Sequence, residues 1–220
     1  MDVASLISGG KDSLFASYVA MQFGWDVKYF LSVIPDDIHS CLFHGLNLHL
    51  LDLISKLTGK PVIRIESKGN EVEDLIELLK RVDVEGVVNG AVASDYQRTR
   101  FNHACKCAGK KSFTPIWHKD PEKLLELQTM AGFRFLIVAS AAEGLEKWLG
   151  KEIGRENVRA FIEDCKRLRV HPCGEGGEYE TFVLECPLYK GKMILREKEF
   201  VREGDFSYVI LKKVDVVESF

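Results

Sequence analysis

The chain has 220 residues, of which 46% are hydrophobic and 29% are charged, and its formal net charge is -3. This composition indicates a soluble globular protein with a sizeable core, and it excludes attraction of nucleic acid by overall charge. The longest apolar runs, such as 135–142, are far shorter than the roughly 20 residues of a membrane-spanning helix, so we expect no membrane partner. Six irregularly spaced cysteines and a start without a leader pattern indicate the reduced cytoplasm.

The N-terminal stretch predicts a strand, a glycine turn and a helix. Residues 3–7 are an apolar run, and 14–23 place their apolar side chains on one helical face. Adjacent glycines between them permit a sharp turn with positive φ, and the free amides at the helix start favour an anion. We therefore expect a phosphate-binding loop made of Ser8, Gly9, Gly10, Lys11, Asp12 and Ser13. Lys11 adds positive charge, and the Asp12 carboxylate is suited to Mg²⁺.

Strands and helices continue to alternate after this unit. The pattern predicts strands at 26–33, 62–65 and 86–92 and helices at 47–58 and 70–82, the last capped by Asn70. The strands are apolar on both faces, which is typical of a parallel sheet covered by helices on its two faces. The fold class predicted for this part is α/β with a doubly wound parallel sheet.

A polar cluster follows the fourth predicted strand, at an edge where parallel sheets bind ligands. Its candidate binding residues are Gly90, Ser94, Asp95, Tyr96, Gln97 and Arg98. The alternative interpretation is a solvated helix start, with Ser94 or Asp95 as the cap.

The pattern changes near residue 112. A strand at 113–117, a helix at 121–131, a strand at 133–140 and a helical region at 142–169, broken near Gly150 and Gly154, precede antiparallel ribbons at the C-terminal end. We expect two domains, one at 1–115 that contains the phosphate loop and a smaller mixed α+β domain at 116–220.

A glycine-rich acidic stretch lies inside the second predicted domain. It comprises Gly174, Glu175, Gly176, Gly177, Glu178, Tyr179, Glu180 and Thr181. Such glycine density predicts a flexible wrap with exposed backbone amides, which we interpret as a substrate-binding segment.

Three motifs together point to a family. The hexapeptide at 8–13 lacks the G-x-x-x-x-G-K-[ST] spacing of the common nucleotide loop and resembles the S-G-G-x-D-S signature of the PP-loop ATP pyrophosphatases, which split ATP to AMP. With Gly-Ala-Val-Ala-Ser-Asp-Tyr-Gln-Arg at 90–98 and Gly-Glu-Gly-Gly-Glu-Tyr-Glu-Thr-Phe at 174–182, the chain resembles the diphthine-ammonia ligase branch of that superfamily. The resemblance spans nearly the whole chain and fits a short form without further C-terminal domains.

The resemblance implies a HUP-like nucleotide-binding fold and a ligase that forms a C–N bond. ATP would activate the carboxylate of diphthine, a modified histidine of translation elongation factor two that also carries a trimethylammonium group. Ammonia would then attack the acyl-adenylate, and AMP and pyrophosphate would leave. Mg²⁺ and the phosphate loop would stabilise the departing charge.

The resemblance also assigns roles, with 1–115 as the PP-loop ATP-binding domain and 116–220 as the substrate-binding domain. The loop 8–13 would bind the β and γ phosphates, Gly90 would lie near the α-phosphate and ribose, and 94–98 would shape the site around the acyl-adenylate. The catalytic candidates are Lys11, Asp12, Glu178 and Glu180, with Asp12 as the Mg²⁺ ligand. Our own inference is that Glu175, Glu178 and Glu180, together with Tyr179, hold the quaternary cation and attract ammonium.

Other functions remain open at this stage. A tRNA thiolase or another adenylating amidase would keep the fold, but a thiolase needs reactive cysteines, and Cys105 and Cys107 on one helix point about 200° apart. A module that only senses nucleotide would have no use for Asp12 or the acidic stretch. No glutaminase arrangement is visible in the sequence, so we expect free ammonium as the donor, and among oligomers a dimer is favoured.

Overall fold

The fold is described from a computed structural model, in which residues 1–38 and 40–218 are placed well enough to describe. The chain divides into two compact units, Met1–Trp117 and His118–Phe220, and each unit is described by itself. Within the described residues, no helix combines the length and the apolar character needed to cross a membrane.

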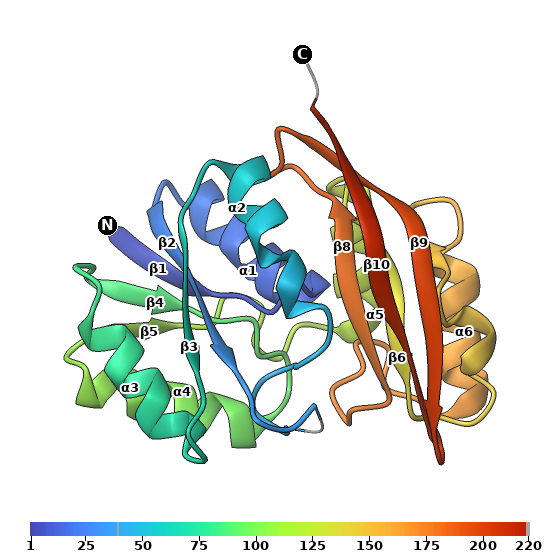
Figure 1. The fold of residues 1–220 in the computed structure, drawn as a ribbon, viewed down its shortest axis with the longest axis horizontal. Helices are drawn as coiled ribbons and strands as arrows, with labels where there is room; N and C mark the ends of the chain where they lie inside the picture. The colour runs from blue at the N-terminus through green and yellow to red at the C-terminus, as the bar shows by residue number, and fades with distance from the viewer. Residues whose placement is uncertain (39, 219–220) are drawn as a thin grey trace. The chain divides into compact units, whose positions relative to one another are not determined.

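The first unit is built on a five-stranded sheet with the order β3-β2-β1-β4-β5 (Figure 1). Its strands are β1 (Asp2–Leu6), β2 (Asp26–Ile34), β3 (Val62–Glu66), β4 (Gly86–Val88) and β5 (Lys111–Phe113). Every neighbouring pair is parallel. Val3, Leu31 and Val87 on the central strands are completely buried, as expected for a sheet covered on both faces.

Four α-helices cover this sheet. They are α1 (Lys11–Gln22), α2 (Leu51–Thr58), α3 (Glu71–Lys80) and α4 (Asp95–Cys107), with a short 3-10 turn, η1 (Leu48–Leu50), before α2. The chain runs outward from β1 to β3 and then crosses back to β4 and β5. Right-handed connections therefore place α1 and α2 on one face and α3 and α4 on the other (Figure 1). The predicted doubly wound α/β class is confirmed.

Local sequence signals explain how these helices begin and end. The side chain of Asn70 accepts a hydrogen bond from the Glu73 amide (3.3 Å) at the start of α3, as predicted. Gly59 ends α2 in the left-handed conformation, with a φ of 68°.

Two predicted strands of this unit are wrong in their extent. β4 ends at Val88, not at residue 92, because the buried Asn89 side chain turns toward β5 and donates to Thr114 Oγ1 (3.0 Å). The strand expected at 113–117 is instead β5, in which Lys111 pairs with Gly86. β5 thus belongs to the parallel sheet of the first unit.

The second unit contains an antiparallel sheet with the order β10-β9-β8-β6-β7. Its strands are β6 (Arg134–Ser140), β7 (Glu152–Ile153), β8 (Tyr179–Glu185), β9 (Gly191–Glu203) and β10 (Phe206–Glu218). β10 also pairs with β6 at residues 207–208, so β6, β8, β9 and β10 form a closed ring. The predicted C-terminal ribbons are confirmed as the long hairpin β9–β10.

The helices of the second unit are α5 (Pro121–Met130) and α6 (Val158–Leu168). The helical region expected at 142–169 is wrong in its first half, which holds a 3-10 turn, η2 (Glu146–Trp148), and β7. The reason is strand pairing, since Ile153 lies opposite Phe135 of β6. Tertiary contacts here outweigh the local helical pattern.

Candidate functional site

The segment between β1 and α1 is a turn held together by its own serines. Gly9 has a φ of 82°, a conformation that glycine adopts without strain. The Ser13 hydroxyl donates to the Gly10 carbonyl (3.0 Å) and lies 3.3 Å from the Ser8 amide, which donates to it. The Gly10 amide donates to the Ser8 hydroxyl (3.4 Å). The loop is therefore ordered before any ligand arrives.

The start of α1 has the chemistry of an anion site. Its N-cap residue is Gly10, and among the described residues no side chain caps this helix. The first amides of a helix have no carbonyl partner within the helix, and the helix dipole adds partial positive charge there. A phosphate group is the usual ligand of such a helix start.

Lys11 and Asp12 form an ion pair at the base of this loop. The Lys11 ammonium donates to the Asp12 carboxylate (2.6 Å), and Lys11 is only 1% exposed. Lys11 therefore lies inside the loop rather than extending into solvent. An oxyanion entering the loop would compete with Asp12 for this ammonium.

Asp12 is also the acidic side chain suited to Mg²⁺ in this loop. No three His, Cys, Asp or Glu side chains gather as a metal site anywhere in 1–38 or 40–218. Magnesium bound with nucleotide usually takes only one or two carboxylates and fills its other positions with phosphate oxygens and water. A single carboxylate beside a phosphate-binding turn fits that pattern.

The backbone after β4 lies directly against the loop. A Cβ atom placed on Gly90 would be 2.6 Å from the Ser13 amide nitrogen and 2.8 Å from the Asp12 carbonyl carbon. Only glycine allows this approach. β1 and β4 are neighbours, and the chain leaves them in opposite directions along the sheet, so this contact marks the topological switch point, where open α/β sheets bind ligands.

In the polar cluster after β4, Ser94 caps α4, and the residues from Asp95 to Arg98 lie in the helix itself. Ser94 accepts from the Gln97 amide (3.3 Å), so the helix-cap interpretation is confirmed for Ser94. Asp95 is exposed. The Arg98 guanidinium lies 4.5 Å from the centre of the Trp117 ring, and the Gln97 side chain donates to the Cys41 carbonyl (3.3 Å).

The glycine-rich acidic loop of the second unit is organised by Glu178. Its carboxylate accepts from the amides of His171 (3.1 Å) and Gly176 (2.7 Å). Gly174 and Gly177 turn the chain with φ values of 74° and 79°. The Glu178 carboxylate therefore accepts the hydrogen bond of the Gly176 amide, which the sequence suggested was open to a ligand.

Tyr179, at the end of this loop, is a core residue. It is 2% exposed, its ring lies edge-on to Phe161 with centroids 5.2 Å apart, and its hydroxyl donates to the Pro172 carbonyl. A ring packed in this way argues against the expected cation contact. Glu175, Glu180 and Thr181 are half-buried.

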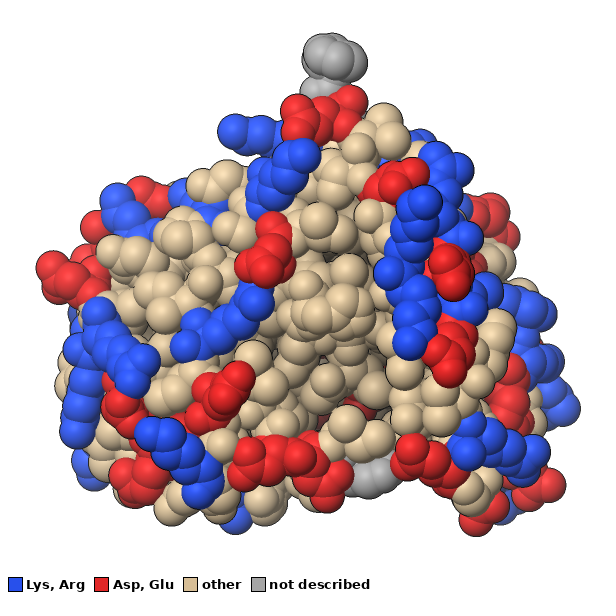
Figure 2. Space-filling view, in the orientation of Figure 1, with Lys and Arg blue, Asp and Glu red and all other residues tan. Residues whose placement is uncertain are grey.

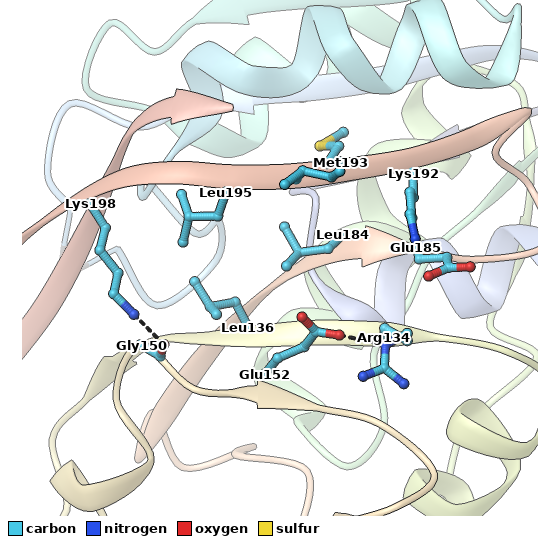
Figure 3. A pocket seen from close by; sticks show the side chains of 11 residues that line it. Arg134, Leu136, Gly150, Glu152, Leu184, Glu185, Lys192, Met193, Leu195 and Lys198 are labelled. Atoms are coloured by element: carbon cyan, nitrogen blue, oxygen red, sulfur yellow. Dashed lines mark hydrogen bonds and ion pairs between the residues drawn. The ribbon is translucent and has the colours of Figure 1, made fainter. Parts of the chain in front are cut away.

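A cavity of about 800 Å³ lies in the second unit and is lined by residues of β6, β7, β8 and β9. Among the described residues β8 and β9 pair only at Glu185 and Lys192, and the cavity lies where they separate. Figure 3 shows Leu136, Leu184 and Leu195 along it. Sequence reasoning missed this cavity, because leucines alternating in a strand indicate a filled core equally well.

Three of the charged side chains at this cavity, Arg134, Glu152 and Lys198, have partners within the unit. Arg134 pairs with Glu152 and with Glu156 (2.6 Å), and these carboxylates raise the pKa of Arg134 above its ordinary value, Glu156 most strongly. Lys198 donates to the Gly150 carbonyl (2.6 Å) (Figure 3). These contacts tie β6 to β7 and β9 to the segment before β7.

The cysteines of α4 do not form a reactive pair. Cys105 is 1% exposed, and burial raises the pKa of its thiol to about 11. Cys107 is exposed. The two side chains point to different sides of the helix, as predicted, and the Cys105 thiol stays protonated at neutral pH.

Surface charge is mixed rather than segregated on the face that Figure 2 shows. Lysine and arginine side chains alternate with aspartate and glutamate across it. Nucleic-acid binding normally uses a continuous basic surface, which this face does not present.

Comparison with known proteins agrees with the motifs. The family model described as "Diphthamide synthase N-terminal domain" matches residues 1–112, and "Diphthamide synthase C-terminal domain" matches 120–217. The chain belongs to the diphthamide synthase family. Within this family it is 36% identical to proteins named diphthine–ammonia ligase from Schizosaccharomyces pombe, over 96% of the chain, and from Rattus norvegicus and Homo sapiens, over 91%.

The family relatives differ in length. The chain spans 39% of the fission yeast protein and 85% of the two mammalian proteins. Among solved structures, a predicted subunit of tRNA methyltransferase from Methanocaldococcus jannaschii matches 85% of this chain and 98% of its own, with a TM-score of 0.47 and 15% identity. That likeness is too slight to support an argument about function.

Proposed function

We propose that this chain is a diphthine–ammonia ligase that uses ATP to amidate diphthine, the last step of diphthamide formation. One observation supports this most strongly. The backbone at Gly90 lies against the uncapped start of α1, at the switch point of a parallel sheet. Family relatives over most of the chain carry that activity in their names.

The loop and its neighbours would hold ATP. The amides at the start of α1, with the hydroxyls of Ser8 and Ser13, would bind the β and γ phosphates. The Lys11 ammonium would exchange its contact with Asp12 for a phosphate oxygen. Gly90 would lie beside the α-phosphate. When bound, Mg²⁺ would be held by Asp12 and would supply positive charge to the departing pyrophosphate.

The reaction would proceed in two displacements. A carboxylate oxygen of diphthine attacks the α-phosphorus, the bond to the β-phosphate oxygen breaks, and pyrophosphate leaves. The lone pair of free ammonia then attacks the acyl carbon, AMP leaves with the former carboxylate oxygen, and the nitrogen loses a proton. A carboxylate is a poor electrophile. Its conversion into a mixed anhydride with AMP makes the acyl carbon reactive toward ammonia.

On the acceptor side, each unit would contribute contacts of its own. In the first unit these would come from the α4 start (Ser94, Asp95, Tyr96, Gln97 and Arg98). In the second unit they would come from the acidic loop, with Glu180 as a catalytic residue. Glu178 would act through the loop that it orders, as a positioning residue. The protein partner would be translation elongation factor two in the cytoplasm, and the dimer is the proposed oligomer.

Mass spectrometry tests this proposal. Elongation factor two carrying diphthine is incubated with the chain, ATP, Mg²⁺ and ammonium. Amidation exchanges a hydroxyl for an amino group, so the modified histidine should lose about one dalton, and only when ATP, Mg²⁺ and ammonium are all present. An unchanged mass beside steady pyrophosphate release would point to a different acceptor, such as tRNA. Absence of pyrophosphate release with every acceptor would favour a nucleotide-sensing module.

A further inference from the structure

A second cavity, of about 420 Å³, lies in the first unit. Its lining residues come from the segments that follow β2 and β3 and from the starts of α3 and α4. Asp36, Asp37, Glu71, Tyr96 and Arg100 are among the side chains that line it.

The rim of this cavity is fixed by hydrogen bonds. Asp74, which is 7% exposed, accepts from the Ser67 hydroxyl and the Lys68 amide, both at 2.9 Å, and so holds the turn from β3 into α3. The Gln97 side chain ties the start of α4 to the Cys41 carbonyl. The cavity is therefore built before a ligand enters.

The charge of the lining is predominantly negative. It includes the carboxylates of Asp36, Asp37 and Glu71 and the single guanidinium of Arg100. Within the described part of the chain, neither Asp36 nor Glu71 forms an ion pair. A ligand with positive charge would find uncompensated carboxylates there.

An aromatic ring lies beside these carboxylates and already binds a cation. Tyr96 is 47% exposed, and the Arg100 guanidinium lies 3.4 Å from its ring centre. Arg100 also donates to the Tyr96 carbonyl (3.2 Å). An aromatic face attracts cations that lie within about 6 Å of its centre. The Arg100 guanidinium thus occupies a position that another cation could take.

We propose that this cavity binds the quaternary ammonium group of the acceptor, with Tyr96 as the aromatic face and Asp36 and Glu71 as the counter-charges. A quaternary ammonium has no N–H to donate, so it is recognised by ring faces and by carboxylates. The bound group takes the place of Arg100 over Tyr96. The identity of the acceptor rests on the proposed function, whereas the preference for a quaternary cation rests on the cavity alone.

Choline and its uncharged isostere 3,3-dimethylbutanol test the cavity by calorimetric titration of the full chain. Choline should bind about tenfold more tightly than the isostere, because only choline gains the cation–aromatic and charge terms. Tyr96→Leu should lose that preference, and Tyr96→Phe should keep it. Arg100→Gln should tighten choline binding, because it removes the competing cation.

Glu71 has a matched control on the same helix. Glu71→Gln should weaken choline binding a few-fold, whereas Glu73→Gln, an exposed residue of α3 outside the cavity, should leave it unchanged. Equal binding of choline and the isostere, no binding of choline, or weaker choline binding in Arg100→Gln would each overturn the inference.

Amidation of diphthine separates this inference from the proposed function. If wild-type protein does not amidate diphthine but the choline pattern holds, the proposed function fails and the cation site stands. If amidation proceeds and Tyr96→Leu leaves the KM for the diphthine protein unchanged, the cation site fails and the function stands. A raised KM in Tyr96→Leu with unaltered ATP affinity supports both.

Discussion

The loop Ser8–Ser13 and the loop Gly174–Tyr179 are both rich in glycine, yet they treat negative charge in opposite ways. In the first loop no side chain of the described residues caps the start of α1, and an uncapped helix start favours an external anion. In the second loop the Glu178 carboxylate accepts from the Gly176 amide of the loop and from the His171 amide just before it. A high density of glycine indicates a tight turn with accessible amides. Whether those amides bind a ligand depends on whether a carboxylate of the protein already accepts their hydrogen bonds.

The first prediction concerns the loop Ser8–Ser13. Gly90→Ala should weaken ATP binding by roughly a hundredfold, because its Cβ would displace the backbone of Ser13 by a sizeable fraction of an ångström or more. Calorimetric titration with ATP measures this. Gly109→Ala is the matched control, since it has open space around its Cβ and a φ of 68°. It should lower stability by about 1 kcal/mol and leave ATP affinity intact. Equal ATP binding by both variants would contradict the proposed role of Gly90.

The second prediction concerns the loop Gly174–Tyr179. Glu178→Gln keeps one acceptor oxygen where two amides need partners, so the second unit should lose about 1–2 kcal/mol of unfolding free energy in urea. Use of the diphthine substrate should fall about tenfold, with ATP affinity unchanged. Glu180→Gln should lower substrate use alone. Unaltered stability of Glu178→Gln would show that its two hydrogen bonds do not order the loop.

The third prediction concerns the ion pairs of Asp164, a residue of α6 in the second unit. Asp164 accepts from Lys147 (2.5 Å), Arg167 (2.9 Å) and the Trp148 ring nitrogen (2.9 Å). Lys147 above all lowers the pKa of Asp164 from 3.8 to about 2. A lowered folded-state pKa stabilises the fold above about pH 4, and this stabilisation disappears as the pH falls toward 2.

The stability advantage over Asp164→Asn should therefore be about 1–2 kcal/mol above pH 4, reduced from the full shift by partial solvent screening, and should vanish near pH 2. Urea unfolding at several pH values measures it. A difference that is constant with pH would rule out the ion-pair explanation. ATP binding at neutral pH serves as the control, because the first loop contains no part of this network.

The smallest effects should come from the thiols. Cys41 and Cys107 are exposed and should react quickly with a thiol reagent. Burial raises the pKa of Cys105 to about 11 and that of Cys186 to about 12, so these thiols should react more than about a hundredfold more slowly. Fast thiols should therefore occur in the first unit only. Cys107→Ala should amidate diphthine at the wild-type rate, and loss of activity would revive a cysteine-dependent mechanism.

Several parts of the site were accessible from sequence because they depend on neighbours in the chain. The strand, turn and helix around Gly9 and the Asn70 cap follow from residues within one or two helical turns. The contact between Gly90 and Ser13 was expected only in outline, because the family resemblance placed Gly90 near the α-phosphate and ribose. The distances that make glycine necessary there required the folded sheet.

The sequence by itself determined the alternating α/β pattern, the phosphate loop and the family motifs, because each rests on periodicity or on a short run of adjacent residues. Tertiary structure alone decided where β4 ends, the pairing that turns residues 152–153 into a strand, and the tasks of Glu178 and Tyr179. It also brought Tyr96, Asp36 and Glu71 to one cavity. These features depend on which distant groups satisfy a polar atom or cover a ring, and no local pattern specifies such partners.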